Sequence, residues 1–283
     1  MKNIIVPTDF SDNAKKAFHY ALKIAVRTGA KIHLIHAFTL LENTFIDRKS
    51  LRDAWNEEQE QKKRALLLQM TEDAKEIQPM VETLPLLYIG STETVLITYA
   101  KEQGADLIVM GTQGASGLAA VLVGSVAASI ISQSEVPVLA IPKDYPGEEP
   151  QSIILTIDRM DQDTDQLQMA ATLAKEFDIP VKVILFFNEN ESFPAKKEFT
   201  EKLDRFADKM REAFPDITIQ SETLEGDNFE EDIQEYCNIN KAGILSMVTY
   251  KRGFWFRIFR PSTTRRMAFQ TTLPLLAMYG NDY

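Results

Sequence analysis

An internal repeat constrains the fold of this 283-residue chain more than any other feature of its sequence. Residues 105–141 align without a gap on residues 242–278, at a constant offset of 137 positions, and both stretches contain a Pro-x-Leu-Ala motif near their ends. The segment 3–9 likewise resembles the segment 152–158. Repeats of this kind indicate copies of one folding unit, so the chain is expected to contain the same unit twice.

Each copy alternates short, β-branched apolar runs with segments of helical spacing, which predicts strands that alternate with helices. Such chains form parallel sheets with right-handed crossovers. We therefore expect an α/β protein with two tandem doubly wound domains, 1–146 and 151–280, each a five-stranded parallel sheet with four helices. Residues 143–150, which combine proline, glycine and charge, are the expected linker.

The same patterns predict the bounds of individual elements. Ser11 is the expected N-cap of the first helix and Gly29 its stop, while Leu51, Trp55 and 66–68 mark the apolar side of the second helix. In the first copy the expected strands are 3–7, 31–38, 80–88, 106–110 and 137–141, and the helices are 13–28, 50–76, 91–103 and one beginning at 125. In the second copy the strands are 152–157, 181–187, 218–223, 243–248 and 274–278, and the helices are 161–177, 199–214 and 229–238.

Composition and charge exclude several classes of protein. A net charge of −10 argues against a general nucleic-acid binder, which needs a basic face. Apolar runs all fall well short of the ~20 residues of a membrane span, and the start of the chain shows no cleavable signal, so we expect a cytoplasmic protein without a membrane partner. With Cys237 as the single cysteine and three histidines, neither an internal disulfide nor a structural metal site is expected.

The candidate ligand site follows strands one and four, because doubly wound sheets bind ligands at the carboxyl ends of their strands. Pro7, Thr8 and Asp9 follow the first strand, and a Gly-x2-Gly-x9-Gly-Ser pattern follows the fourth. Glycine permits close approach of the backbone to an anion, and the amides at the start of a helix are suitable donors for phosphate. The pattern comprises Gly111, Gly114, Gly124 and Ser125.

These glycines, the Pro-Thr-Asp segment and the Pro-Val-Leu-Ala-Ile strand at 137–141 resemble the ATP-binding branch of the universal stress protein family, over both halves of the chain. The resemblance implies the adenine-nucleotide alpha-hydrolase-like fold of UspA and an ATP ligand, with Mg²⁺ left open. It implies that the glycines and Ser125 bind ribose and phosphates, that Asp9 contacts the nucleoside, and that the backbone of Ala37 holds adenine, although the family usually has valine there. The full expected set is Pro7, Thr8, Asp9, Ala37, Met110, Gly111, Gln113, Gly114, Gly124, Ser125 and Val126.

The second copy departs from this pattern at every glycine. Val248, Lys251 and Pro261 stand where the first copy has Gly111, Gly114 and Gly124, and a proline removes an amide donor. Asp158 and Ser262 remain, but two polar groups do not make a phosphate site. We expect the second site to bind no nucleotide.

A basic, aromatic segment, 251–266, replaces the glycine loop in the second copy. It carries six arginines and lysines among four large aromatic residues. We favour the interpretation that it fills the vacated site, with Trp255 at least partly buried. The alternative is a docking surface for an acidic partner, an anion or nucleobases.

Isolated polar residues are expected to be structural. His33 and His36 point to opposite faces of one strand, so they cannot form a pair, and both are interpreted as buried or edge histidines. Cys237 is interpreted as a core residue rather than a reactive thiol.

The leading hypothesis is a cytoplasmic nucleotide-binding stress-response or signalling protein in which ATP occupancy of the first copy sets conformation or partner choice. The sequence shows no P-loop and no evident catalytic group, so we do not expect an enzyme. A slow ATPase and a scaffold that binds no nucleotide remain alternatives. We also expect the closing strands of the two copies to pair as an internal pseudo-dimer, with further homodimerisation left open.

Overall fold

A computed structural model describes residues 1–41, 49–113, 124–157, 164–188, 190, 192–249 and 272–280. The first half contains β1 (Asn3–Pro7), α1 (Asp12–Thr28), β2 (Lys31–Phe38), α2 (Lys49–Ile77), β3 (Thr83–Ile89), α3 (Thr92–Glu102), β4 (Leu107–Gly111), α4 (Ser125–Gln133) and β5 (Val138–Ile141). The second half contains β6 (Ile153–Ile157), the 3-10 helix η1 (Thr164–Leu167), α5 (Gln168–Phe177), β7 (Val181–Asn188), α6 (Phe193–Ala213), β8 (Ile219–Gly226), α7 (Phe229–Ile239), β9 (Ile244–Thr249) and β10 (Leu275–Tyr279).

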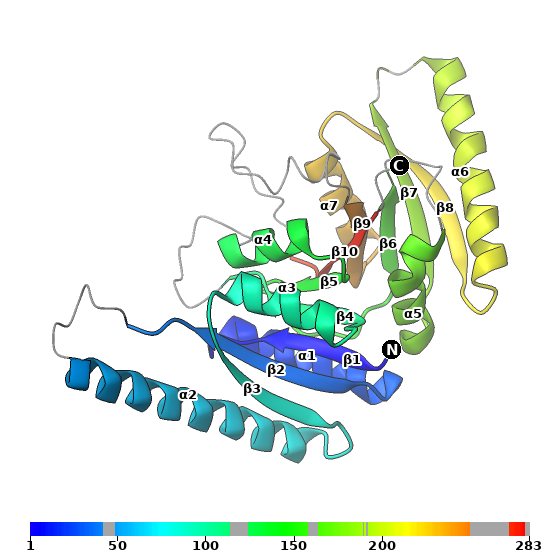
Figure 1. Ribbon diagram of the computed structural model, residues 1–283. Coiled ribbons are helices and arrows are strands. Elements are labelled where there is room, and N and C mark those ends of the chain that lie inside the picture. The colour runs from blue at the N-terminus through cyan, green and yellow to red at the C-terminus, as the bar shows by residue number, and fades with distance from the viewer. Residues whose placement is uncertain are drawn as a thin grey trace.

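The strands form one continuous ten-stranded sheet in the order β3-β2-β1-β4-β5-β10-β9-β6-β7-β8 (Figure 1). Pairing within each half is parallel, as in β1 with β2 and with β4. The two halves meet where β5 and β10 pair antiparallel, with Leu139 opposite Leu276. The predicted α/β class and the tandem doubly wound sheets are therefore confirmed. The closing strands of the two copies lie at the centre of the molecule.

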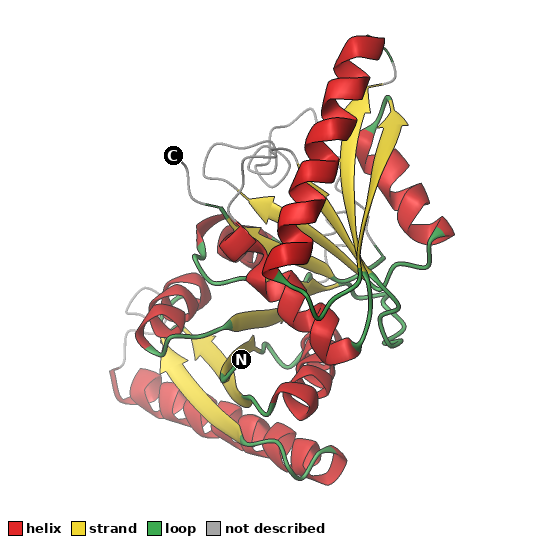
Figure 2. Cartoon of the chain, turned by 90° about the vertical axis from the view of Figure 1, so that its right-hand side faces the viewer, coloured by secondary structure: helices red, strands yellow, loops and turns green. Residues whose placement is uncertain are grey.

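Alternation along the strands explains why helices cover both faces of the sheet, as Figure 2 shows. In β1, Ile4 and Val6 join a core cluster with α1, α2, α5 and α6, whereas Ile5 joins a second cluster with α3, α4 and α7. The two clusters extend through both halves of the chain. The inner strands, such as β1, β4 and β6, are consequently buried on both sides, which is typical of parallel sheets between helical layers, whereas the edge strands β3 and β8 are partly exposed.

The predicted ends of the first helix are confirmed. The Ser11 hydroxyl accepts a hydrogen bond from the amide of Ala14, and Gly29 ends α1 in the left-handed conformation with φ of 69°. The helix therefore begins shortly after Asp9, and its first turn lies beside the end of β1.

Four predicted boundaries were wrong. β8 continues to Gly226 rather than ending at 223. β3 begins at Thr83 rather than 80, because Met80 lies in a turn and is 94% exposed. α6 begins at Phe193 rather than 199, since Pro194 in its first turn starts a helix well and was not used as a start signal. The α-helix predicted from 161 is described as η1 followed by α5, and 158–163 lie outside the described residues. A fourth helix of the second half would fall within 250–271, also outside them.

The apolar side predicted for α2 was correct at Leu67 and wrong at its other residues. Leu67, Met70, Thr71 and Ala74 are its buried residues, while Leu51, Trp55, Leu66 and Leu68 are exposed. A helix of 29 residues is about 43 Å long, whereas the seven residues of β3 extend about 23 Å. Much of α2 therefore extends past the strand it packs against, and Leu51 and Trp55 near its start have no layer to cover them. Leu66 and Leu68 are exposed for another reason, since each lies about 100° around the helix from the buried Leu67.

The expected linker is bound along α1 rather than free. The Lys16 ammonium donates to the carbonyl of Lys143 (2.6 Å), the Lys23 ammonium donates to that of Gly147 (2.6 Å), and Tyr145 is buried. Arg27 pairs with Glu149 at 2.7 Å and lies over the ring of Phe177 in α5. These contacts hold the connection between the halves against the first half.

Candidate functional site

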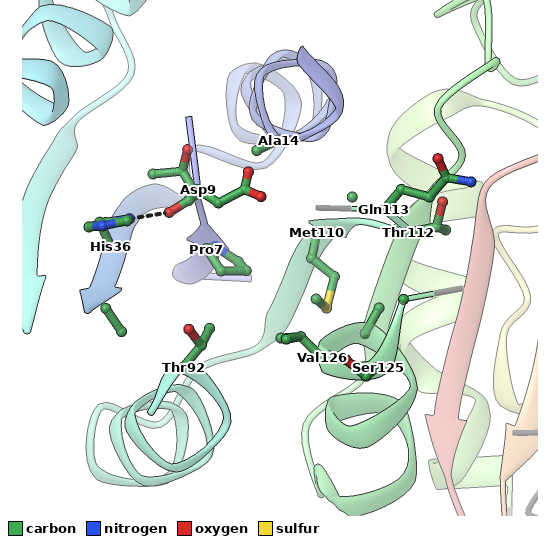
Figure 3. A pocket seen from close by; sticks show the side chains of 15 residues that line it. Pro7, Asp9, Ala14, His36, Thr92, Met110, Thr112, Gln113, Ser125 and Val126 are labelled. Carbon is green, nitrogen blue, oxygen red and sulfur yellow. Dashed lines mark hydrogen bonds between the residues drawn. The ribbon is translucent and has the colours of Figure 1, made fainter. Parts of the chain in front are cut away.

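One cavity opens where the carboxyl ends of β1 and β4 lie side by side, at the point where the strand order of the first half reverses (Figure 3). Ten of the eleven expected site residues line it, and the other, Gly114, lies outside the described residues. The ten are Pro7, Thr8, Asp9, Ala37, Met110, Gly111, Gln113, Gly124, Ser125 and Val126.

The loop after β1 has a conformation that turns Asp9 outward. The amide of Phe10 donates to the Thr8 hydroxyl oxygen (3.0 Å), and the amide of Ser11 donates to Oδ1 of Asp9 (3.0 Å). Phe10 has a φ of 67°, which is uncommon for a residue with a side chain. The exposed Asp9 carboxylate is thereby placed at the mouth of the cavity.

Gly111 and Gly124 both lie against atoms of the chain itself that leave little room for a side chain. A Cβ on Gly111 would lie 2.7 Å from Oδ1 of Asn13, so a protein neighbour excludes the side chain there. Gly124 is the N-cap of α4, and its amide already donates to the carbonyl of Thr112 (2.6 Å). The amides left for a ligand are those of the first turn of α4, which have no partner within the helix.

His36 is a cavity residue that sequence reasoning missed. Its Nδ1 donates to the carbonyl of Thr8 (2.6 Å), and its ring lies 4.5 Å from that of Phe10, centroid to centroid. Burial lowers the pKa of His36, opposed by the hydrogen bond to Thr8 and assisted by Lys63. The imidazole is therefore neutral near pH 7. In the sequence, the position of His36 next to Ala37 at the end of β2 could have indicated that it lies in the cavity.

His33 lies on the opposite face, as predicted, where its Nδ1 is 2.7 Å from the Tyr99 hydroxyl and its Nε2 is 3.3 Å from Oδ1 of Asn3. It is buried, and burial lowers its pKa, with Lys31 as a smaller cause in the same direction. His33 and His36 consequently belong to separate polar clusters.

Four further residues line the cavity without having been predicted: Ala14, Thr92, Thr112 and Ala127. Thr92 opens α3, and Figure 3 shows its side chain directed toward the cavity. The start of a helix after the third strand could have indicated it, since this end of the sheet gathers every βα turn.

The cavity contains little formal charge. Among the described residues that line it, only Asp9 and His36 are ionisable. An anionic group would therefore be held by amides and hydroxyls rather than by lysine or arginine from those lining residues. Within the described part of the chain, no cluster of three or more His, Cys, Asp or Glu side chains could hold a metal ion. The helices described there are also too short or too polar to cross a membrane.

In the second half, Val248 occupies the position of Gly111 and is buried near the end of β9. The other positions aligned with the site of the first half, Asp158, Lys251, Pro261 and Ser262, lie outside the described residues, as does the whole basic aromatic segment with Trp255. Cys237 is buried as predicted, and burial raises the pKa of its thiol to about 12.

Known proteins resemble both the sequence of the first half and the fold of the whole chain. A universal stress protein of Methanocaldococcus jannaschii is 30% identical over 142 residues, which are 50% of this chain and 82% of the relative. One from Mycobacterium tuberculosis is 32% identical over 145 residues, 50% of this chain and 95% of the relative. The crystal structure of a universal stress protein from Archaeoglobus fulgidus has the same fold, with a TM-score of 0.69 at 18% identity, over 99% of this chain and 97% of that one. The sequence model of the universal stress protein family matches residues 1–142, and the chain belongs to that family.

Proposed function

We propose that the first half of this protein binds ATP, with or without Mg²⁺, in the cavity between β1 and β4, and that the chain acts as a nucleotide-dependent stress-response or signalling factor in the cytoplasm. The observation that carries this proposal is the convergence on one cavity of ten predicted residues from four separate segments of the sequence, beside the start of α4. The role proposed is binding rather than catalysis.

Backbone groups of Ala37 support recognition of a nucleobase. In a parallel strand, the N–H and C=O of one residue point to the same side, and this side alternates along the strand. The carbonyl of Ile35 accepts from the amide of Thr8, so residue 35 points toward β1, and Ala37, two residues later, does the same. Because β1 ends at Pro7 opposite Ile35, the peptide groups of Ala37 face the cavity. A donor and an acceptor from one residue suit the edge of adenine.

The other lining groups suit the rest of the nucleotide. Phosphate oxygens accept hydrogen bonds from the first-turn amides of α4 and from the Ser125 hydroxyl, and the helix dipole adds to this attraction. The carboxylate of Asp9 is an acceptor for ribose hydroxyl groups. This arrangement needs no lysine from the lining residues, because amides supply the donors.

Isothermal titration of ATP into the purified chain tests the proposal, together with identification of any nucleotide that copurifies. We expect about one nucleotide per chain and loss of binding in Gly124→Leu, whose side chain would crowd the start of α4. Gln133→Leu, at the exposed far end of α4, is the matched control and should bind normally. Absence of binding by the unaltered chain, or normal binding by Gly124→Leu, would refute the proposal. Phosphate release measured on the same samples separates a slow ATPase from a binding protein.

A further inference from the structure

Asn13 joins three elements beside the cavity although its own side chain does not line it. It is the second residue of α1 and is 4% exposed. Its Nδ2 donates to the carbonyl of Ile141 at the end of β5 (3.0 Å), and its Oδ1 accepts from the amide of Gln113 after β4 (2.9 Å). One buried amide therefore ties the start of α1 to the ends of β4 and β5, with its donor and its acceptor both used.

Gly111 is the residue that makes room for this side chain. A Cβ at Gly111 would lie 2.7 Å from Oδ1 and 2.8 Å from Cγ of Asn13, which is closer than such atoms approach. The glycine of the fourth strand and the asparagine of the first helix thus depend on each other. Replacement of Gly111 alone leaves a clash, and replacement of Asn13 alone takes away the acceptor of the Gln113 amide, whereas the Ile141 carbonyl keeps its bond from the amide of Thr112.

The second half has lost both members of this pair. Val248 stands at the position of Gly111, and Gln162 stands at the position of Asn13 when 3–9 is aligned on 152–158. A β-branched side chain such as that of Val248 would need the space that Asn13 fills in the first half. The joint change is the expected result if the two residues act as a unit.

The hydrogen bonds of Asn13 continue into the start of α4. The amide of Thr112 donates to the same Ile141 carbonyl (3.0 Å), and the carbonyl of Thr112 accepts from the amide of Gly124 (2.6 Å). The turn held by Asn13 therefore sets the place of the N-cap of α4. The amides of the first turn of α4, which have no partner within the helix, come directly after this N-cap.

We propose that Asn13 is a positioning residue of the nucleotide site, which fixes the turn 111–113 and through it the phosphate-binding start of α4. This inference rests on the proposed function for the identity of the ligand, ATP, whereas the hydrogen bonds of Asn13 do not depend on that function. Asn13 touches no ligand in this scheme. It acts through the amide of Gln113 and the carbonyl of Ile141.

The geometry is tested without nucleotide on the full chain. Hydrogen exchange should show the amide of Gln113 protected in the unaltered protein and unprotected in Asn13→Ala, because its acceptor is gone. In a double-mutant cycle of unfolding, Gly111→Ala should be strongly destabilising alone and much less so combined with Asn13→Ala, since the clash is removed. Unchanged exchange of Gln113, or strictly additive effects, would overturn the pairing.

The consequence for the site is tested by titration with ATP. Asn13→Ala should weaken binding roughly tenfold, the loss expected when one or two ordering hydrogen bonds are removed. Leu22→Ala, a buried change further along the same helix, is the control for lost stability and should bind normally while folded. Asn13→Asp keeps the acceptor and the size, so the Gln113 amide should stay protected, but its second carboxylate oxygen would face the Ile141 carbonyl and should lower the free energy of unfolding.

The outcomes separate the two proposals. If the unaltered chain binds no ATP, the proposed function fails, and the exchange and unfolding results still decide whether Asn13 fixes the turn. If ATP binds the unaltered chain and Asn13→Ala equally well, the positioning role is refuted while the proposed function stands. Equal weakening by Asn13→Ala and Leu22→Ala would also refute it.

Discussion

Acidification should destabilise this protein at pH values where carboxylates are still ionised, because two of its histidines are buried. His33 and His36 are 3% and 8% exposed, and burial lowers the pKa of both. Nδ1 of His36 donates to the carbonyl of Thr8, so a second proton would enter at Nε2. That atom is buried and has no hydrogen-bond partner within the described part of the chain. The folded protein therefore resists protonation of His36.

The sign and size of the effect follow from proton linkage. An unfolded histidine has a pKa of about 6.5. Below that pH the unfolded chain binds protons that the folded chain rejects, so stability falls as pH decreases from about 6.5 toward the folded pKa. Between about pH 7.5 and about pH 5.5, a histidine kept fully neutral in the fold would cost about 1.4 kcal/mol. Two would cost at most about 3 kcal/mol, a large part of a typical stability of about 5–15 kcal/mol.

Urea unfolding at the two ends of this range measures the effect. His36→Gln and His33→Gln should each reduce the pH dependence, and the double variant should nearly abolish it. His19→Gln is the matched control, because His19 is the third histidine of the chain and is exposed. We expect that variant to keep the pH dependence of the unaltered protein.

Two results would refute this reasoning. One is a free energy of unfolding that is the same at both ends of the range. The other is an acid-induced loss that persists unchanged in the chain without His33 and His36, which would place the titrating groups elsewhere.

Two further predictions concern the centre and the far side of the molecule. Residues 1–146 expressed alone should dimerise or aggregate, because β5 is buried here between β4 and β10 and would then have an unpaired apolar edge. Sedimentation that showed a monomer at all concentrations would contradict this prediction. The Cys237 thiol, whose pKa burial raises to about 12, should not react with a disulfide reagent at about pH 8 until the protein is unfolded, and rapid modification of the native chain would show that α7 opens.

Features that depend on neighbours within a few residues were readable from the sequence alone. The alternation of strands and helices, the caps Ser11 and Gly29, and the turns after β1 and β4 all have local causes, and the repeat was visible by comparing one half of the sequence with the other. Because carboxyl ends of parallel strands gather at one edge of a sheet, the turns also indicated where the cavity lies. The turns gave Pro7, Thr8, Asp9, Gly111, Gly124 and Ser125, and the resemblance to the universal stress protein family added the other four of the ten predicted lining residues.

The lengths of neighbouring elements were not readable in this way. Of the apolar side that local spacing predicted for α2, Leu67 is buried, whereas burial at Leu51 and Trp55 depends on how far β3 extends beneath the helix. A sequence pattern describes one element at a time. Which part of a long helix is covered is a property of two elements together.

The roles of Asn13 and His36 were decided only by the tertiary structure. A lone asparagine in the first turn of a helix reads as a solvent-facing residue, and a histidine in an apolar strand reads as core. Asn13 meets partners 100 and 128 positions away, and His36 meets one 28 positions away. Local preferences are set by steric and hydrogen-bonding effects among adjacent residues, whereas a buried polar side chain takes its function from whichever backbone groups the finished fold brings within about 3 Å of it.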